Sequence, residues 1–126
     1  MKTKSLTFLL SLTFLFLFSG SSVVFADDFQ DGLDAYNRKD YKTAYKLFLP
    51  LAEQGYAPAQ FNLGVMYLRG LGVLQDYMSA HMWFNLSGSN GYKDAVKNRN
   101  IVENKMTPSQ IEKAQEMARN WKPTSR

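Results

Sequence analysis

The chain has no cysteine and one histidine among its 126 residues, so it lacks most of the side chains that build disulfides, metal sites and acid–base catalysts. Without cysteine there is no disulfide framework, no thiolate metal site and no lipid anchor on a cysteine. His81 has no second histidine as a partner, and no G-x-S-x-G sequence is present. We therefore expect no catalytic residue, no metal and no cofactor.

A long apolar run occurs at the N-terminus, where it forms part of a predicted leader. Basic Met1–Lys4 precedes the 13-residue apolar run Leu6–Phe18, and small residues follow up to Ala26. This order is typical of a secretory signal peptide, and we expect an exported protein that is periplasmic or secreted. The alternative is an anchor that stays uncleaved, although 13 residues fall short of the roughly 20 that a membrane span needs.

A strong excess of one charge is also missing once the leader is set aside. Cleavage after Ala26 would leave 126 − 26 = 100 residues, with 13 basic and 11 acidic side chains and a net charge of +2. Near balance predicts no nucleic-acid partner. We also expect no stable membrane insertion after cleavage.

Two stretches of the remaining chain match each other at a spacing of 36 residues. When Asp40–Ala59 is aligned with Asp76–Ala95, seven of 20 positions are identical. The matching aromatic and alanine residues recur at helical spacing, so each copy predicts an amphipathic helix. Gly55 and Gly91 suit the left-handed backbone position just after such a helix.

A second kind of helix is predicted between the two copies. Ala59, Leu63 and Met66 form its apolar face, and Gly64 lies in its interior. An interior glycine costs a helix about 1 kcal/mol relative to alanine, so Gly64 indicates the close approach of another helix. With a first helix at Phe29–Asn37, a further one at Val96–Lys105 and a last one that begins with the capping box of Thr107–Gln110, we predict about six helices and no strand.

These positions resemble the Sel-one-like repeat (SLR), a relative of the tetratricopeptide repeat with the pattern A-x-x-x-L-G-x-x-Y-x-x-G-x-G-V-x-x-D-x-x-x-A-x-x-W. The residues that carry the resemblance and the glycine and alanine that follow it are Ala59, Leu63, Gly64, Tyr67, Gly70, Gly72, Asp76, Ala80, Trp83, Gly91 and Ala95. The resemblance implies an all-α fold, a short right-handed α-solenoid of antiparallel helix pairs with a C-terminal capping helix, of the exported bacterial type.

The resemblance also divides the chain into four parts. Residues 1–26 are the signal peptide, residues 27–58 a partial, tetratricopeptide-like first repeat, and residues 59–94 a full Sel-one-like repeat. Residues 95–126 hold a partial third repeat and the capping helix.

Proteins of this family usually act as adaptors, so the resemblance implies a non-enzymatic module that binds a protein or peptide in a concave groove. By their place in the repeat, nine residues are expected to face that groove: Phe29, Leu33, Tyr36, Phe61, Val65, Leu68, Arg69, Lys97 and Ile101. An apolar stripe with a basic rim suits a peptide with hydrophobic anchors and negative charge. The alternatives are that the last helix covers the groove, or that the protein is a cell-wall hydrolase or regulates an envelope enzyme.

Overall fold

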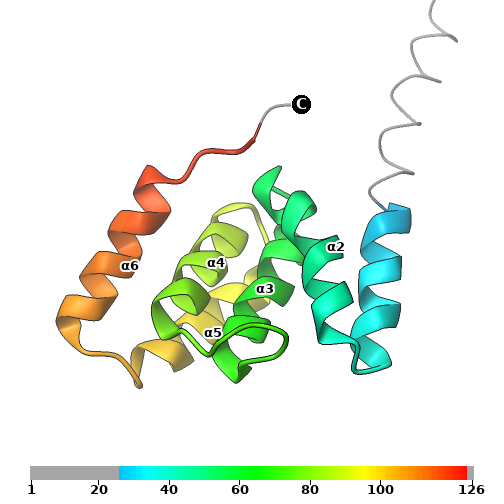
Figure 1. The fold of residues 1–126 in the computed structure, drawn as a ribbon. Helices are drawn as coiled ribbons and strands as arrows, with labels where there is room; N and C mark the ends of the chain where they lie inside the picture. Colours follow the sequence, from blue (N-terminus) through cyan, green and yellow to red (C-terminus); the bar gives the residue numbers. More distant parts are fainter. Residues whose placement is uncertain (1–25, 125–126) are drawn as a thin grey trace, which may run out of the picture.

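The computed structural model describes residues 26–124, which form six helices and no strand (Figure 1). The first helix covers residues 26–37 of the described chain. It is followed by α2 (Tyr41–Glu53), α3 (Ala57–Arg69), α4 (Tyr77–Ser89), α5 (Lys93–Glu103) and α6 (Pro108–Asn120). The predicted all-α class is confirmed. The predicted leader lies outside the described residues, apart from Ala26.

Helices α4 and α6 begin at capping residues that the sequence marks as starts. The Asp76 carboxylate accepts hydrogen bonds from the backbone N–H groups of Met78 at 3.0 Å and Ser79 at 3.3 Å, which caps α4. Thr107 and Gln110 bond each other's backbone N–H groups at the start of α6, so the predicted capping box is confirmed. The helix predicted at Val96–Lys105 instead begins at Lys93, because Tyr92 has the extended backbone that precedes it.

Glycine allows the two helices of each unit to pack closely. A Cβ atom on Gly64 of α3 would lie 2.5 Å from Cε1 of Phe84 in α4, so only hydrogen fits there. Gly32 of the first helix has the same relation, also at 2.5 Å, to Cε1 of Phe48 in α2. The close approach predicted at Gly64 is confirmed, and Gly32 is a second such contact that the sequence analysis missed.

The loop that joins α3 to α4 turns back onto an earlier helix. Gly72 has a φ angle of +71°, and a Cβ atom there would lie 2.7 Å from the backbone oxygen of Tyr41 at the start of α2. Another residue would be strained in backbone and would collide with that carbonyl group. The G-x-G sequence therefore fits the loop onto the preceding unit.

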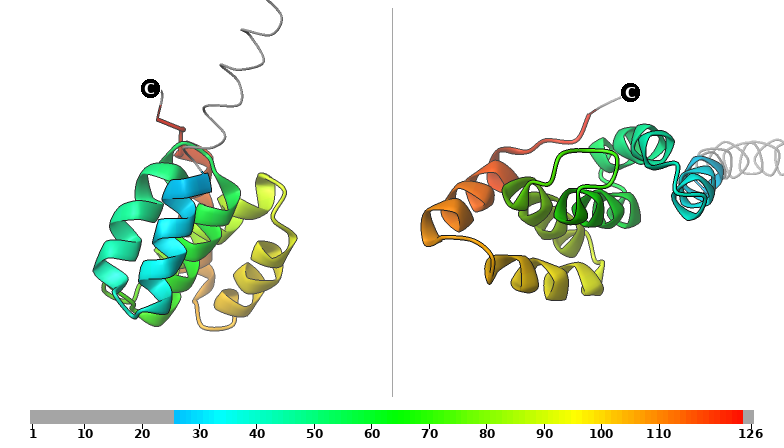
Figure 2. Two further views of the ribbon diagram at one scale, coloured as in Figure 1. Left: turned by 90° about the vertical axis from the view of Figure 1, so that its right-hand side faces the viewer. Right: turned by 60° about the horizontal axis from the view of Figure 1, so that its bottom comes forward.

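Helix α4 lies at the centre of the C-terminal half and packs against α3, α5 and α6. The ring of Trp121, just after α6, meets that of Trp83 edge to face with centroids 6.4 Å apart. The chain then crosses to α2, where the backbone N–H of Thr124 bonds the oxygen of Glu53 at 2.8 Å. Figure 2 shows the first helix at one end of the array, α6 at the other, and α5 alongside α4.

Buried polar side chains tie neighbouring units together. Gln60 of α3 donates to the backbone oxygen of Ala52 in α2 at 3.0 Å and accepts from Asn90 after α4 at 3.1 Å. Ser87 of α4 donates to the oxygen of Ala57 at 2.8 Å. These bonds satisfy groups that would otherwise be buried without partners, and they fix the register between helices.

None of the helices within residues 26–124 is both long enough and apolar enough to cross a membrane.

Candidate protein-interaction surface

Two of the aromatic residues expected in the groove take part in a repeated internal packing pattern. Phe29 lies against Phe48, with ring centroids 5.6 Å apart, and meets Tyr56 edge to face at 5.3 Å. Phe61 makes the equivalent contacts in the next unit, with Phe84 at 5.7 Å and Tyr92 at 4.7 Å. Both phenylalanines are half-buried, so only part of each ring is left for a ligand.

The other apolar residues expected beside them are half-buried as well. Leu33 and Tyr36 pack against the core of the first unit, where Tyr36 also meets Tyr41 edge to face at 5.3 Å. Val65 and Leu68 pack against the second core, formed by Ala80, Phe84, Ala95 and Val102. These side chains support the fold from the same positions that the sequence analysis assigned to the groove.

The remaining expected residues are open to solvent. Arg69 at the end of α3 and Lys97 on α5 are exposed, and Ile101 has 44% of its surface exposed. Val96 of α5 and Leu74 of the α3–α4 loop are exposed too, at 38% and 90%. The sequence analysis named neither Val96 nor Leu74.

The last helix leaves this part of the surface uncovered. Helix α6 packs against α4, and the side chains of Ala118 and Trp121 join the core on that side. Arg69, Lys97 and Ile101 stay exposed with α6 in place.

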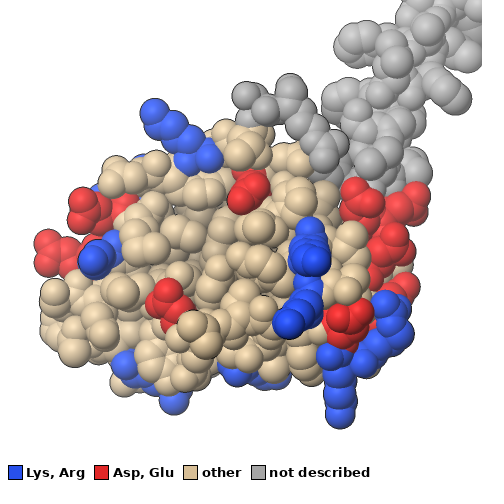
Figure 3. Space-filling view, in the orientation of Figure 1, with Lys and Arg blue, Asp and Glu red and all other residues tan. Residues whose placement is uncertain are grey.

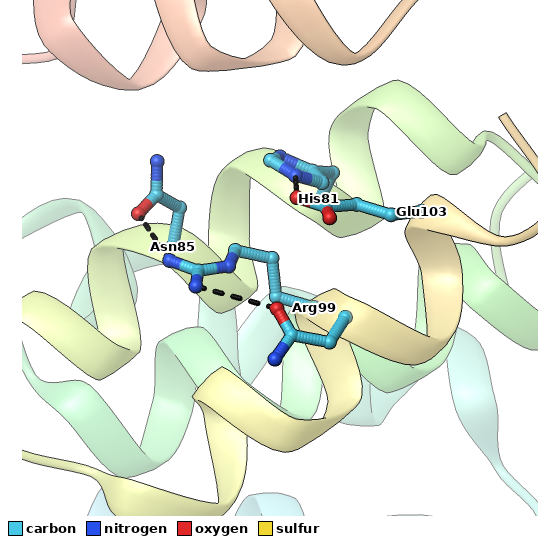
Figure 4. Close-up of polar contacts among 5 residues, drawn as sticks. His81, Asn85, Arg99 and Glu103 are labelled. Atoms are coloured by element: carbon cyan, nitrogen blue, oxygen red, sulfur yellow. Dashed lines mark hydrogen bonds and ion pairs between the residues drawn. The ribbon is translucent and has the colours of Figure 1, made fainter. Parts of the chain in front are cut away.

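His81 lies fully buried on α4, where it links this helix to α5. Its Nε2 atom is 2.8 Å from Oε1 of Glu103, and its Nδ1 atom is buried with no hydrogen-bond partner. Arg99 reaches across the same helix pair to Oδ1 of Asn85 at 3.3 Å (Figure 4). In residues 26–124, no group of three or more histidine, cysteine, aspartate or glutamate side chains is placed to hold a metal ion.

Two other polar contacts shift the pKa of a group that takes part in them. Burial, together with the hydrogen bond between the hydroxyl groups of Tyr67 and Tyr45 at 2.9 Å, raises the pKa of Tyr67 above its usual value. At the start of α2, hydrogen bonds from the side chain and backbone of Thr43 lower the pKa of Asp40. The first contact joins α2 to α3, and the second caps α2.

A comparison with protein families matches the Sel1 repeat model to residues 29–56 and 57–92, the two glycine-paired units described above. The chain belongs to the Sel1 repeat family. Sel1 repeats form α-solenoids, generally mediate protein–protein interaction and typically act as non-catalytic scaffolds. The predicted Sel-one-like repeat is thereby confirmed.

One solved structure shares this Sel1 repeat architecture at 34% sequence identity and a TM-score of 0.71. It is a protective antigen present in uropathogenic Escherichia coli strains that displays an SLR fold. The match covers 77% of this chain and 22% of the antigen chain, so this protein spans less than a quarter of the length of that relative. No curated protein matches the chain significantly.

Proposed function

We propose that this Sel1 repeat protein is an exported, non-enzymatic adaptor that binds another protein or peptide through the face formed by the first helix of each unit. The observation that carries the proposal is membership of an interaction-repeat family, together with open side chains on α3 and α5 at positions expected to face a ligand. The N-terminal sequence order, basic then apolar then small, supports export.

The chemistry of this face favours an acidic partner with hydrophobic anchors. Arg69 and Lys97 supply positive charge, and the exposed part of Ile101 supplies apolar surface. The half-buried Val65 and Leu68 extend that apolar surface along α3. Charge of this kind speeds encounter and selects partners, while apolar anchors in desolvated contacts provide most of the affinity. Without the predicted leader the net charge is only +2, which argues against nucleic acid as the partner.

Charge reversal of the exposed residues tests the proposed surface. The variant R69E/K97E should lose partner capture in a crosslinking pull-down from the native envelope, while its helical circular dichroism stays unchanged. The matched control K42E/K113E makes the same charge change on exposed positions of α2 and α6 and should keep capture. Equal capture by both variants would refute the assignment of the surface. Phe61 is unsuitable for this test because its ring packs between Phe84 and Tyr92.

Export is tested separately by N-terminal sequencing of the protein recovered from cell fractions. We expect the mature chain to begin at Asp27 and to occur outside the cytoplasm. A chain that retains Met1–Ala26 and sediments with membranes would instead support the uncleaved anchor.

The alternative of a cell-wall hydrolase gains no support from the environment of the one histidine. His81 is fully buried, and its Nε2 atom is bonded to Glu103, so it has no path to a substrate in this conformation.

A further inference from the structure

The two ends of the array differ from its middle at positions that the repeat makes equivalent. The contacts of Phe29 and Gly32 in the first helix match those of Phe61 and Gly64 in α3, which sets a register of 61 − 29 = 32 residues between these helices. From α3 to α5 the register is 95 − 59 = 36 residues, because Ala59 and Ala95 are both fully buried toward the preceding helix. Residues of the three helices can therefore be compared one by one.

At the C-terminal end, the side of α5 that would carry a further unit is open and basic. The corresponding side of α3 carries Phe61 and Val65, which pack toward α5. Their equivalents on α5 are Lys97 and Ile101, and no unit within residues 26–124 covers them. Lys93, Lys97 and Ile101 follow one another at a spacing of four residues on this side of the helix, and all three are exposed. We call these three residues the α5 end face.

At the N-terminal end, the side of the first helix that would receive a preceding unit is acidic. In α3 this side carries Ala59, Leu63 and Met66, which are fully buried against the first unit. The equivalent residues of the first helix are Asp27, Asp31 and Asp34, and all three are exposed. Asp34 accepts a hydrogen bond from Gln30 on the same helix at 3.0 Å. We call these three aspartates the Asp face, and Figure 3 shows acidic side chains gathered where this helix lies.

We propose that copies of this protein associate head to tail, with the Asp face of one copy docked on the α5 end face of the next. Within the chain, Phe61 and Val65 of α3 pack against a core that contains Ala95 and Val102 of α5, the equivalents of Asp27 and Asp34, together with Phe84 of α4. If the charges served only to keep both ends of the array soluble, the two ends could carry the same sign. Here one face carries three carboxylates and the other carries two ammonium groups. Because the two faces are different patches, the contact is heterologous and can continue into chains of molecules.

The apolar side chain of the α5 end face adds to the charge complementarity. Ile101 lies one turn after Lys97 and has 44% of its surface exposed. Docking would remove this surface from water, whereas the ion pairs would set the orientation of the two copies.

Sedimentation velocity of the natural form of the protein, purified from producing cells, tests the association. We expect the sedimentation coefficient to rise with protein concentration at low ionic strength. Association should be lost at high salt, since the Debye length falls from about 30 Å at 0.01 M to about 3 Å at 1 M. A single monomer at every concentration and both salt levels would overturn the proposal, as would association that strengthens with salt.

Charge exchange identifies the two faces. The variants D31K/D34K and K93E/K97E should each sediment as monomers, because each then carries two ends of like charge. An equimolar mixture should assemble again, because the exchanged ends attract one another. The control K42E/K113E should assemble like the natural protein. Assembly of either face variant alone, or a mixture that stays monomeric, would contradict the pairing.

The self-association and the proposed partner surface share Lys97 and are distinguished by residues that they do not share. D31K/D34K should abolish self-association and keep partner capture. R69E should keep self-association and weaken capture. Each proposal can therefore fail while the other stands.

Discussion

Replacement of Gly64 by alanine tests whether close helix approach holds each unit together. The added Cβ atom would lie 2.5 Å from Cε1 and 2.6 Å from Cδ1 of Phe84, a ring that is fully buried and has no path to solvent. Overpacking of this kind costs about 1–3 kcal/mol. The better helix propensity of alanine returns about 1 kcal/mol. We expect a net loss of up to about 2 kcal/mol, and each kcal/mol lowers the melting temperature of a domain of this size by about 4–8 °C.

Gly88 provides a matched control, because it is another glycine inside a helix. A Cβ atom there would lie 2.9 Å from Cγ2 of Val96, a side chain that is 38% exposed and can rotate away. G88A gains the same helix propensity without pressing on a buried ring, so we expect unchanged or slightly higher stability. Urea unfolding followed by far-ultraviolet circular dichroism measures both variants.

The double variant G64A/F84L separates packing from propensity. A smaller side chain at position 84 makes room for the new methyl group, so the double variant should lose less stability than the sum of the two single changes. A G64A protein as stable as G88A, or strictly additive changes in the double variant, would refute the proposed contact.

Three further predictions concern the ends and links of the helices. D76A should lose about 1 kcal/mol because it removes the cap of α4, whereas D94A, which makes no cap bond, should be near neutral in the same urea titration. The pKa of Tyr67 is raised in the folded state, so the stability that this tyrosine contributes is present below the unfolded pKa of 10.0 and is lost as the pH rises above that value. The variant Y67F should therefore lack this alkaline loss of stability in pH-dependent thermal melts. An unchanged loss in Y67F would show that another group causes it. W121A should lower the free energy of unfolding by about 1–2 kcal/mol, less than the 3–5 kcal/mol typical of a fully buried aromatic residue. It should also shift the fluorescence of Trp83 to the red, because the two rings are in contact. The exposed K122A serves as control.

Helical spacing and capping residues were sufficient to predict the secondary structure. Asp76, Thr107 and Gly70 act within a few residues of themselves, so their effect can be read locally. The start of α5 was misplaced by three residues, because the extended backbone of Tyr92 has no distinctive sequence signal.

The proposed binding surface depended more on tertiary structure. Repeat position placed Phe29 and Phe61 at the groove, but it could not indicate that each ring is shared between its own unit and the tyrosine that begins the next. Repeat position also predicted that Lys97 and Ile101 face the groove. They are exposed because α6 packs against α4 and leaves them uncovered. A packing partner far along the chain determines whether a helix position is buried.

The sequence by itself therefore determined the helices, their caps and the repeat family, because these follow from local conformation and from spacing along one chain. The tertiary structure decided which equivalent positions are covered and which are free. Asp31 and Leu63 occupy the same place in their units, yet the aspartate is exposed and the leucine is fully buried. The reason is that a preceding unit packs against α3 and none packs against that side of the first helix within the described chain.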